Sequence, residues 1–139
     1  MSEDTYLAER LEYEINWYEK KSKINKRFYY LIRTIEFTSA ALIPLLINFL
    51  TNDVDLLKNI IEVLGFIVVI STSTISLFQF NELWTAYRTN AESLKHEKYL
   101  FLSSIKPYDT NQKHEILVER VERLISTENS RWQELSSSK

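Results

Sequence analysis

The chain carries two long apolar runs between stretches that are rich in charge. Residues 34–50 read TIEFTSAALIPLLINFL and residues 60–80 read IIEVLGFIVVISTSTISLFQF, with one charged residue in each. As helices they would measure about 25 and about 32 Å, against a hydrocarbon thickness of roughly 30 Å. Both runs are therefore predicted to cross a membrane, the first with help from its flanking residues.

The outer stretches have the spacing of amphipathic helices. Apolar residues recur every three or four positions at both ends: Leu7, Leu11, Ile15 and Tyr18 before the first run, and Val118, Val121, Ile125 and Trp132 near the end of the chain. The helical pattern continues past the second run, so one helix is expected to extend from it to a break at Pro107. One Gly and two Pro leave too few turn residues for an all-β fold. The predicted fold class is all-α.

Basic residues gather on one side of the two runs. They crowd the sequence before the first run and after the second, whereas the connection from 51 to 59 holds Lys58 beside Asp53 and Asp55. By the positive-inside rule, both termini are cytoplasmic. We expect a two-span transmembrane helical hairpin that folds as a single domain, 1–139, with these parts: a cytoplasmic helix at 1–33, transmembrane helices at 34–50 and 60–80, and cytoplasmic helices at 81–139.

A soluble four-helix bundle, with the two apolar runs as its central helices, is the alternative fold. A helix in such a bundle usually keeps one face of charged or strongly polar side chains for water. Apolar residues surround each run and neither has a charged face, which favours the membrane.

Small and polar residues follow one side of the second run. At about 100° per residue, they fall within roughly a third of the circumference. This polar stripe consists of Glu62, Gly65, Val69, Thr72, Ser73, Ser76 and Gln79. Repeated around the axis of a homo-oligomer, it would line a water-filled path, whereas the alternative role of such residues is close helix packing. Ser71 and Thr74 lie off the stripe, where they could bond to their own helix.

Each apolar run holds one carboxylate. A carboxylate near the bilayer centre costs on the order of 2.5 to 3.5 kcal/mol, so it needs a partner or a path for water. Glu36 follows Arg33 by three residues, which predicts an intramembrane ion pair. Glu62 either pairs with Lys58 or joins Asp53 and Asp55 in an outer acidic ring that concentrates cations.

The composition gives little support to catalysis. A net charge of -2 is not that of a nucleic-acid-binding protein, and the lack of Cys excludes thiolate chemistry. His96 and His114 are isolated, and a single Gly permits no phosphate-binding loop. We expect no enzyme activity, no metal site and no cofactor.

Four segments resemble a known family: WYEKKSKINKRFYYLIR, ALIP, WTAYRTNAESLKHEKYLF and VERVERLISTENSRW. The most specific tract is W-x2-Y-R-x3-E-x-L-K-x-E, from Trp84 to Glu97. On these residues the chain resembles the bacterial two-transmembrane domain-of-unknown-function family 4231, which is related to the SLATT superfamily. The matching residues include Trp17, Tyr18, Trp84, Tyr87, Arg88, Glu92, Lys95, Glu97 and Trp132.

The resemblance implies a two-span membrane protein with both termini inside the cell. SLATT-like proteins linked to nucleotide-signalling defence systems are proposed to form pores that depolarise the cell. We expect the matching residues to build the assembly, with Trp84 and Tyr87 at the membrane interface and Arg88 paired to Glu92 at i,i+4 spacing. Trp17 and Trp132 would lock the two terminal helices.

The first functional hypothesis is a homo-oligomeric channel in the inner membrane of a bacterium. It would pass small cations along the polar stripe of the second transmembrane helix. The alternative is a membrane-anchored helical scaffold whose cytoplasmic helices bind another protein. The expected partners are membrane lipid, further copies of the chain and, for the channel, small ions, with no nucleic acid.

Overall fold

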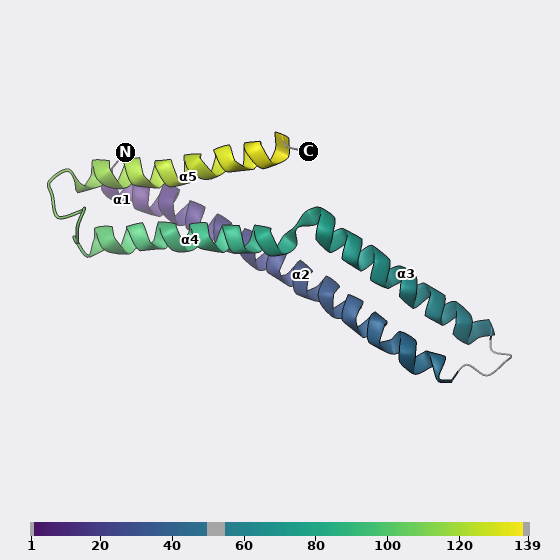
Figure 1. The fold of residues 1–139 in the computed structure, drawn as a ribbon. Coiled ribbons are helices and arrows are strands. Elements are labelled where there is room, and N and C mark those ends of the chain that lie inside the picture. Colours follow the sequence, from purple (N-terminus) through teal and green to yellow (C-terminus); the bar gives the residue numbers. More distant parts are fainter. Residues whose placement is uncertain (1, 50–54, 138–139) are drawn as a thin grey trace. The chain divides into compact units, whose positions relative to one another are not determined.

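The computed structural model describes residues 2–49 and 55–137. Within these ranges the regular secondary structure is helical, without a strand, and the all-α prediction is confirmed. In chain order the elements are α1 (Glu3–Thr5), the π-helical stretch η1 (Tyr6–Leu11), α2 (Glu12–Ile47), α3 (Asp55–Phe78), α4 (Phe80–Leu102) and α5 (Lys113–Ser137) (Figure 1).

The contacts divide the chain into two compact units. Unit 1 comprises residues 1–22 and 86–139, and unit 2 comprises residues 23–85. Helices α2 and α4 therefore each contribute one part to unit 1 and another part to unit 2.

Unit 2 is an antiparallel helix pair. Phe28 of α2 stacks on Phe80, at 6.1 Å between ring centroids, and the hydroxyl of Thr72 on α3 donates to Glu36 of α2. Residue 28 thus contacts residue 80 and residue 36 contacts residue 72, so the two segments run in opposite directions. Helix α2 continues past Pro44 and ends at Ile47.

The apolar side chains of unit 2 are largely uncovered. The helical stretches Tyr6–Ile47 and Asp55–Leu102 each contain an apolar window long enough to cross a membrane, and only 11% of each window is buried. Phe37, Phe66 and Leu77 are 66%, 65% and 70% exposed. The central helices of a soluble bundle would be mostly buried instead, so unit 2 does not have the packing that the soluble alternative requires.

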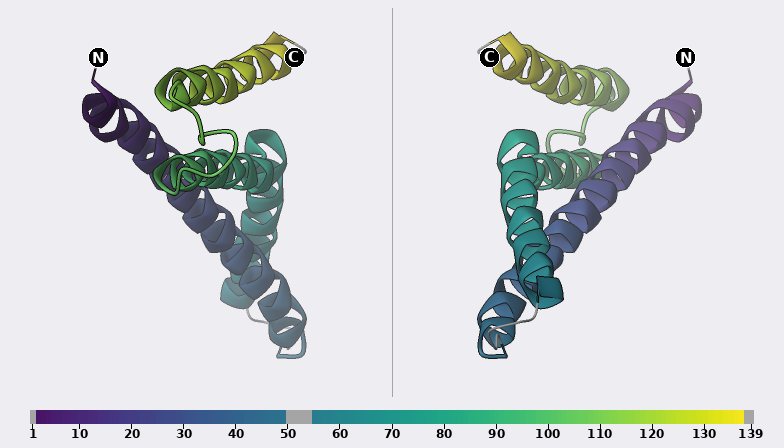
Figure 2. Two further views of the ribbon diagram at one scale, coloured as in Figure 1. Left: turned by 90° about the vertical axis from the view of Figure 1, so that its left-hand side faces the viewer. Right: turned by 90° about the vertical axis from the view of Figure 1, so that its right-hand side faces the viewer.

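Gln79 interrupts the helix that was expected to continue from the second apolar run. Helix α3 ends at Phe78 and α4 begins at Phe80, and between them Gln79 has a φ of 49°, in the left-handed region. The Gln79 N–H still donates to the Ile75 carbonyl, and the Leu83 N–H donates to the Gln79 carbonyl, both at 3.0 Å. The ribbon passes from α3 to α4 through this break (Figures 1 and 2). The prediction of one unbroken helix is wrong at this residue. The break was not foreseen because no Gly or Pro lies there to indicate it.

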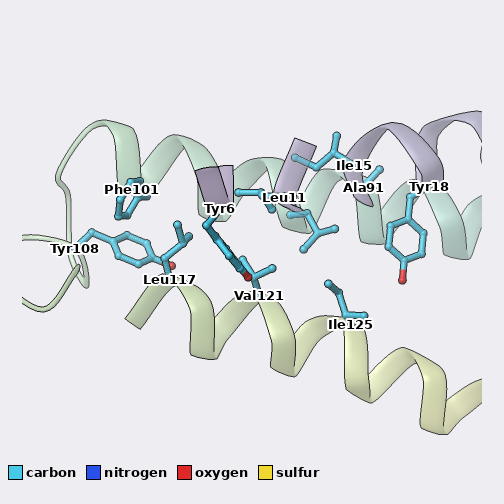
Figure 3. Packing of buried hydrophobic residues seen from close by; sticks show 11 residues of the cluster. Tyr6, Leu11, Ile15, Tyr18, Ala91, Phe101, Tyr108, Leu117, Val121 and Ile125 are labelled. Carbon is cyan, nitrogen blue, oxygen red and sulfur yellow. The ribbon is translucent and has the colours of Figure 1, made fainter. Parts of the chain in front are cut away.

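Unit 1 is held together by a core that draws on three helical segments and one connection (Figure 3). The buried apolar residues are Tyr6, Leu11, Ile15 and Tyr18 near the N-terminus, Ala91, Leu94 and Phe101 of α4, Tyr108 of the connection, and Leu117, Val121 and Ile125 of α5. Burial of each large side chain contributes about 1.5 to 3 kcal/mol. Of the apolar residues that the amphipathic spacing had indicated, Leu11, Ile15, Tyr18, Val121 and Ile125 are buried in this core. Leu7 and Val118 are partly buried against it.

Helix α4 ends in a hydrogen-bonded reverse turn at Ser104. The Ser104 N–H donates to the Phe101 carbonyl and the Ile105 N–H to the Leu100 carbonyl, both at 3.1 Å. Ser104 itself has a φ of 50°. This is the Schellman arrangement, in which the left-handed position is usually Gly because a Cβ is unfavourable there.

We predict that Ser104→Gly stabilises unit 1. Gly adopts the left-handed conformation without the steric cost of a Cβ, and part of that gain is offset by the greater freedom of Gly in the unfolded chain. The expected gain in the free energy of unfolding is about 0.5 kcal/mol, measured by chemical denaturation followed by circular dichroism. Ser103→Gly is the matched control, because Ser103 continues the helical hydrogen bonding to Tyr99 and Gly weakens a helix. Equal effects of the two variants would contradict the assignment.

Candidate functional site

Polar side chains of unit 2 meet at Glu36. Arg33 Nη1 donates to one carboxylate oxygen of Glu36 at 2.9 Å, and the Thr72 hydroxyl donates to the other at 2.6 Å. The Arg33 guanidinium also lies 5.8 Å from the ring centroids of Tyr29 and Phe37. The expected pair of Arg33 and Glu36 thus forms and has a third member, Thr72, which the sequence had assigned to the lining of a path.

One part of the polar stripe lies on the side of α3 opposite to its buried side. Ser71 of α3 and Ser39 of α2 are the buried polar residues of this helix pair, at 7% and 6% exposure. Two residues subtend about 200° on a helix, so Ser73 lies on the side of α3 opposite to Ser71. The exposed members of the stripe are Glu62, Val69, Thr72, Ser73, Ser76 and Gln79.

The surroundings of Gly65 and Thr74 bear on the role of small and polar residues in α3. A Cβ added to Gly65 would meet no atom within 4 Å, so this Gly does not serve close packing inside the chain. The Thr74 hydroxyl donates to the Ile70 carbonyl at 2.8 Å, as its position off the stripe suggested. Ser71, by contrast, is buried. Among the described residues of the stripe, Thr72 is the one whose side chain donates a hydrogen bond to α2.

The acidic residues at the far end of α3 are only partly described. Asp53 lies outside the described residues. Asp55 and Glu62 are exposed, and Lys58 Nζ lies 3.6 Å from Asp55 Oδ1. Lys58 thus approaches Asp55, not the Glu62 carboxylate that its i,i+4 spacing had offered as a partner.

Aromatic rings and cations collect at the opposite end of unit 2. Phe80 stacks between Phe28 and Phe78, at centroid distances of 6.1 and 5.5 Å. Lys26 Nζ lies 5.4 Å from the Trp84 ring centroid and 6.0 Å from that of Tyr30. This aromatic end has the composition of a membrane interface, where amphipathic rings and long basic side chains are enriched.

The family residues of unit 1 form an aromatic cluster. Trp17 meets Tyr18 edge to face at 5.0 Å and Tyr87 at 5.8 Å, and the Lys21 ammonium lies 5.6 Å from the Trp17 ring. Trp17 therefore joins α2 to α4 within unit 1. The side chain of Trp132, its expected counterpart, lies outside the described residues.

Ionic contacts tie α4 to the N-terminal segment of unit 1, which comprises α1, η1 and the part of α2 up to Ser22. Lys95 pairs with Glu19, and its Nζ lies 3.6 Å from Glu92 Oε1. Lys98 pairs with Glu12. The sequence had assigned Glu92 to Arg88, which is exposed, but Glu92 approaches Lys95, three residues farther along the same helix.

Glu97 forms a buried network that the sequence did not predict. Its carboxylate accepts two hydrogen bonds from Arg120, from Nε at 2.9 Å and from Nη2 at 2.7 Å, and a third from the Tyr108 hydroxyl. Burial alone raises the pKa of Glu97, but Arg120 and Tyr108 outweigh it and hold the pKa below its usual range. The three residues join α4, the connection and α5.

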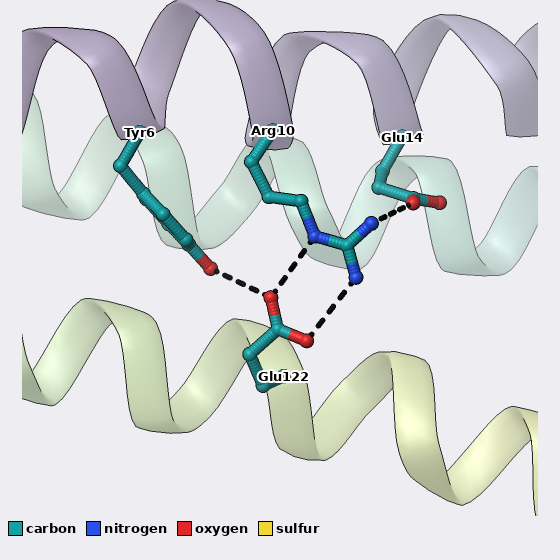
Figure 4. Close-up of polar contacts among 4 residues, drawn as sticks. All are labelled: Tyr6, Arg10, Glu14 and Glu122. Atoms are coloured by element: carbon teal, nitrogen blue, oxygen red, sulfur yellow. Dashed lines mark hydrogen bonds and ion pairs between the residues drawn. The ribbon is translucent and has the colours of Figure 1, made fainter. Parts of the chain in front are cut away.

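Glu122 makes the corresponding link from α5 to the N-terminal segment (Figure 4). Arg10 donates to its two carboxylate oxygens at 3.1 and 3.2 Å, and the Tyr6 hydroxyl donates to it at 3.2 Å. Arg10 Nη1 also donates to Glu14 at 2.5 Å. The guanidinium lowers the pKa of Glu122. Partners 112 and 116 residues away leave no local signal in the sequence.

A shallow depression in unit 1 is too small for a substrate. Its free volume is about 10 Å³, close to what one water molecule requires. Its lining residues are Tyr18, Asn90, Ser93, Leu94, Leu124, Ile125 and Glu128.

The family model described as "Protein of unknown function (DUF4231)" matches residues 13–116, well over half of the chain. The chain belongs to this family. The resemblance to family 4231 is therefore confirmed, and the matched region spans both long apolar helices of the family member described here. No curated protein and no solved structure matches this chain.

We predict that Glu97→Gln destabilises unit 1 of this DUF4231 protein. The substitution leaves the Arg120 guanidinium without its carboxylate, and hydrogen bonds to charged groups contribute about 1.5 to 3 kcal/mol each. Since Arg120 is half-exposed and water can solvate it, the expected loss in the free energy of unfolding is about 2 to 3 kcal/mol in all.

Glu119→Gln is the matched control for this measurement. Glu119 pairs with Arg123, and both side chains are more than two-thirds exposed, at 68% and 69%. Exposed pairs contribute about 0 to 1 kcal/mol. Denaturant titrations of the two variants and the wild type give the comparison, and a loss for Glu97→Gln no larger than that of the control would refute a structural role for the network.

The lowered pKa values of Glu97 and Glu122 predict acid sensitivity. A carboxyl whose pKa is lower in the folded than in the unfolded state stabilises fully above the unfolded value, about 4.3 for Glu. That contribution is lost as the pH falls through the folded pKa. The midpoint of urea unfolding should therefore change little between pH 7 and 5 and drop below about pH 4. A combined Glu97→Gln and Glu122→Gln variant should show a shallower drop, and an unchanged pH profile would rule out both groups as its cause.

Proposed function

We propose that this protein spans a bacterial inner membrane as a helical hairpin with both termini in the cytoplasm. Support comes from unit 2, whose apolar helices are long enough and too little covered for water. The positive residues precede α2's apolar run and follow that of α3, which by the positive-inside rule puts these ends in the cytoplasm.

The hairpin is proposed to assemble into a homo-oligomeric channel for small cations. The observation that carries this proposal is that Ser73, on the side of α3 opposite to the buried Ser71, is exposed, as is Ser76. Two helices cannot enclose a path, but copies of α3 around an axis would bring Ser73 and Ser76 together. The hydroxyls would replace part of the hydration shell of an ion.

Transport along such a path would be passive. Glu62, with Asp53 and Asp55, would form the outer acidic ring and raise the local cation concentration. The Thr72 hydroxyl is used by Glu36, so Ser73 and Ser76 are the main hydroxyl lining. Gly65 and Val69 would leave room between the hydroxyl layers, and Gln79 would lie at the inner end.

A scaffold that binds a cytoplasmic protein is the second candidate. Unit 1 is a compact body with its own core and exposes Tyr13 and Tyr99 at 62% each and Leu102 at 57%. Exposed aromatic side chains of this size are common at protein interfaces. In this case the exposed stripe of α3 would serve only to join copies of the chain.

The channel is tested by ion flux from liposomes that contain the purified protein. The wild type should release potassium and sodium in preference to chloride. Ser73→Leu with Ser76→Leu should abolish this flux in an oligomer that still assembles, because two Leu side chains fill and dry the path. Glu62→Gln should weaken cation flux by removing charge from the mouth.

Thr74→Leu is the control, since it also replaces a hydroxyl by Leu but at a position off the stripe. It should leave the flux unchanged. Loss of assembly in the Ser73 and Ser76 variant would favour the scaffold, because these residues would then be packing contacts. No flux from an inserted wild-type oligomer would contradict the channel.

A further inference from the structure

Three cations share one face of α2 at the aromatic end of unit 2. Lys23, Lys26 and Arg27 are related by three- and four-residue steps, which brings neighbouring Cβ atoms to about 5 to 6 Å. Tyr30 continues the same face. From residue 20 to residue 35 the sequence has no Asp or Glu, so this face of unit 2 carries charge of one sign.

No carboxylate among the described residues pairs with these three side chains. Glu36, farther along α2, is occupied by Arg33 and Thr72. Glu82 of α4 precedes Trp84 by two residues, and residues two apart do not face each other on a helix. The positive charge of this cluster, Lys23, Lys26 and Arg27, is therefore available to bind an anion from outside the chain.

Aromatic rings hold one cation of the cluster in place. The Lys26 ammonium lies over the rings of Trp84 and Tyr30, at 5.4 and 6.0 Å from their centroids. The Trp84 Nε1–H donates to Asn81 Oδ1 at 3.1 Å, which fixes the orientation of the indole. A cation–π contact leaves the ammonium protons able to donate to a phosphate oxygen.

The surroundings of the cluster are apolar on one side. Phe28, with 51% of its surface exposed, stacks on Phe80, which stacks on Phe78, itself 60% exposed. An anion bound here would thus lie beside exposed phenyl rings. A ligand in which glycerol links a phosphate to acyl chains satisfies both requirements, whereas a free nucleotide or an acidic peptide satisfies only the first.

We propose that Lys23, Lys26 and Arg27, together with Trp84, bind the phosphodiester headgroup of an anionic phospholipid at the membrane surface. The proposal rests on the membrane insertion of unit 2 and is independent of channel activity. The cations supply the charge that selects anionic over zwitterionic lipid. Trp84 and the phenylalanine rings contact the upper part of the acyl chains.

The test is quenching of Trp84 fluorescence by brominated lipids in vesicles. The full-length chain with Trp17→Phe and Trp132→Phe keeps Trp84 as the single reporter, and circular dichroism checks its fold. All vesicles are equal mixtures of phosphatidylcholine and phosphatidylglycerol, and in each sample only one of the two lipids is brominated. Flotation on a density gradient first shows which protein is inserted.

Phosphatidylglycerol should quench Trp84 more strongly than phosphatidylcholine. Each charge removed, by Lys23→Gln or Arg27→Gln, should lower the relative affinity for the anionic lipid about five-fold, since a basic residue near an anionic surface contributes about 1 kcal/mol. Lys58→Gln, at the other end of the helix pair, removes the same charge and should change nothing.

Three results would overturn the proposal, and they are distinguishable. Protein that does not float with the vesicles refutes membrane insertion itself. Floating protein that both lipids quench equally refutes only the lipid site. An equal loss of preference in Lys58→Gln and in the cluster variants would show a general surface-charge effect without a site.

Discussion

The uncovered apolar surface of α2 and α3 in unit 2 decides what the protein can be. Apolar surface exposed to water costs about 25 cal/mol for each Å², and side chains such as Phe37, Phe66 and Leu77 are each about two-thirds exposed. A helix satisfies its own backbone hydrogen bonds, so it can place such a surface in lipid without loss. The proposed membrane location and the proposed assembly of several copies of the chain both follow from this one constraint.

Within that apolar surface, the polar side chains fall into two classes. Glu36 has two partners from its own chain, Arg33 and Thr72, which reduce the cost of a carboxylate at membrane depth. Ser73 and Ser76 are exposed instead. Hydroxyl contacts between membrane helices contribute only about 0.6 kcal/mol on average, so their presence is not explained by stability alone. The polar path of the proposed oligomer would give these two hydroxyls a polar environment.

The sequence predicted features that depend on near neighbours and missed those that depend on distant ones. Hydropathy located both apolar helices, and i,i+3 spacing located the Arg33 and Glu36 pair. Periodicity placed Ser73 and Ser76 on one side of α3, but it could not show that Thr72 turns toward α2. Glu97 was recognised only as a family residue, since its partners lie 11 and 23 residues away.

Backbone conformation set a second limit on prediction. Gln79 and Ser104 both adopt left-handed φ values, a conformation whose usual sequence signal is Gly. At both sites the residue takes part in local backbone hydrogen bonds, from the Gln79 N–H to the Ile75 carbonyl and from the Ser104 N–H to the Phe101 carbonyl. The break at Gln79 therefore could not be read from the pattern of apolar residues, which continues through it.

The ionic contacts of unit 1 connect its three helical segments in every pairwise combination. Glu97 joins α4 to α5, Glu122 joins α5 to the N-terminal segment, and Lys95 joins α4 back to α2 through Glu19. A shift of one segment must therefore break contacts with both others. Such an arrangement specifies one relative position of the three segments, a task that an apolar core alone performs less strictly. This explains why the charged family residues Lys95 and Glu97 act as structural groups of unit 1, with their charges directed at other helices of the same chain.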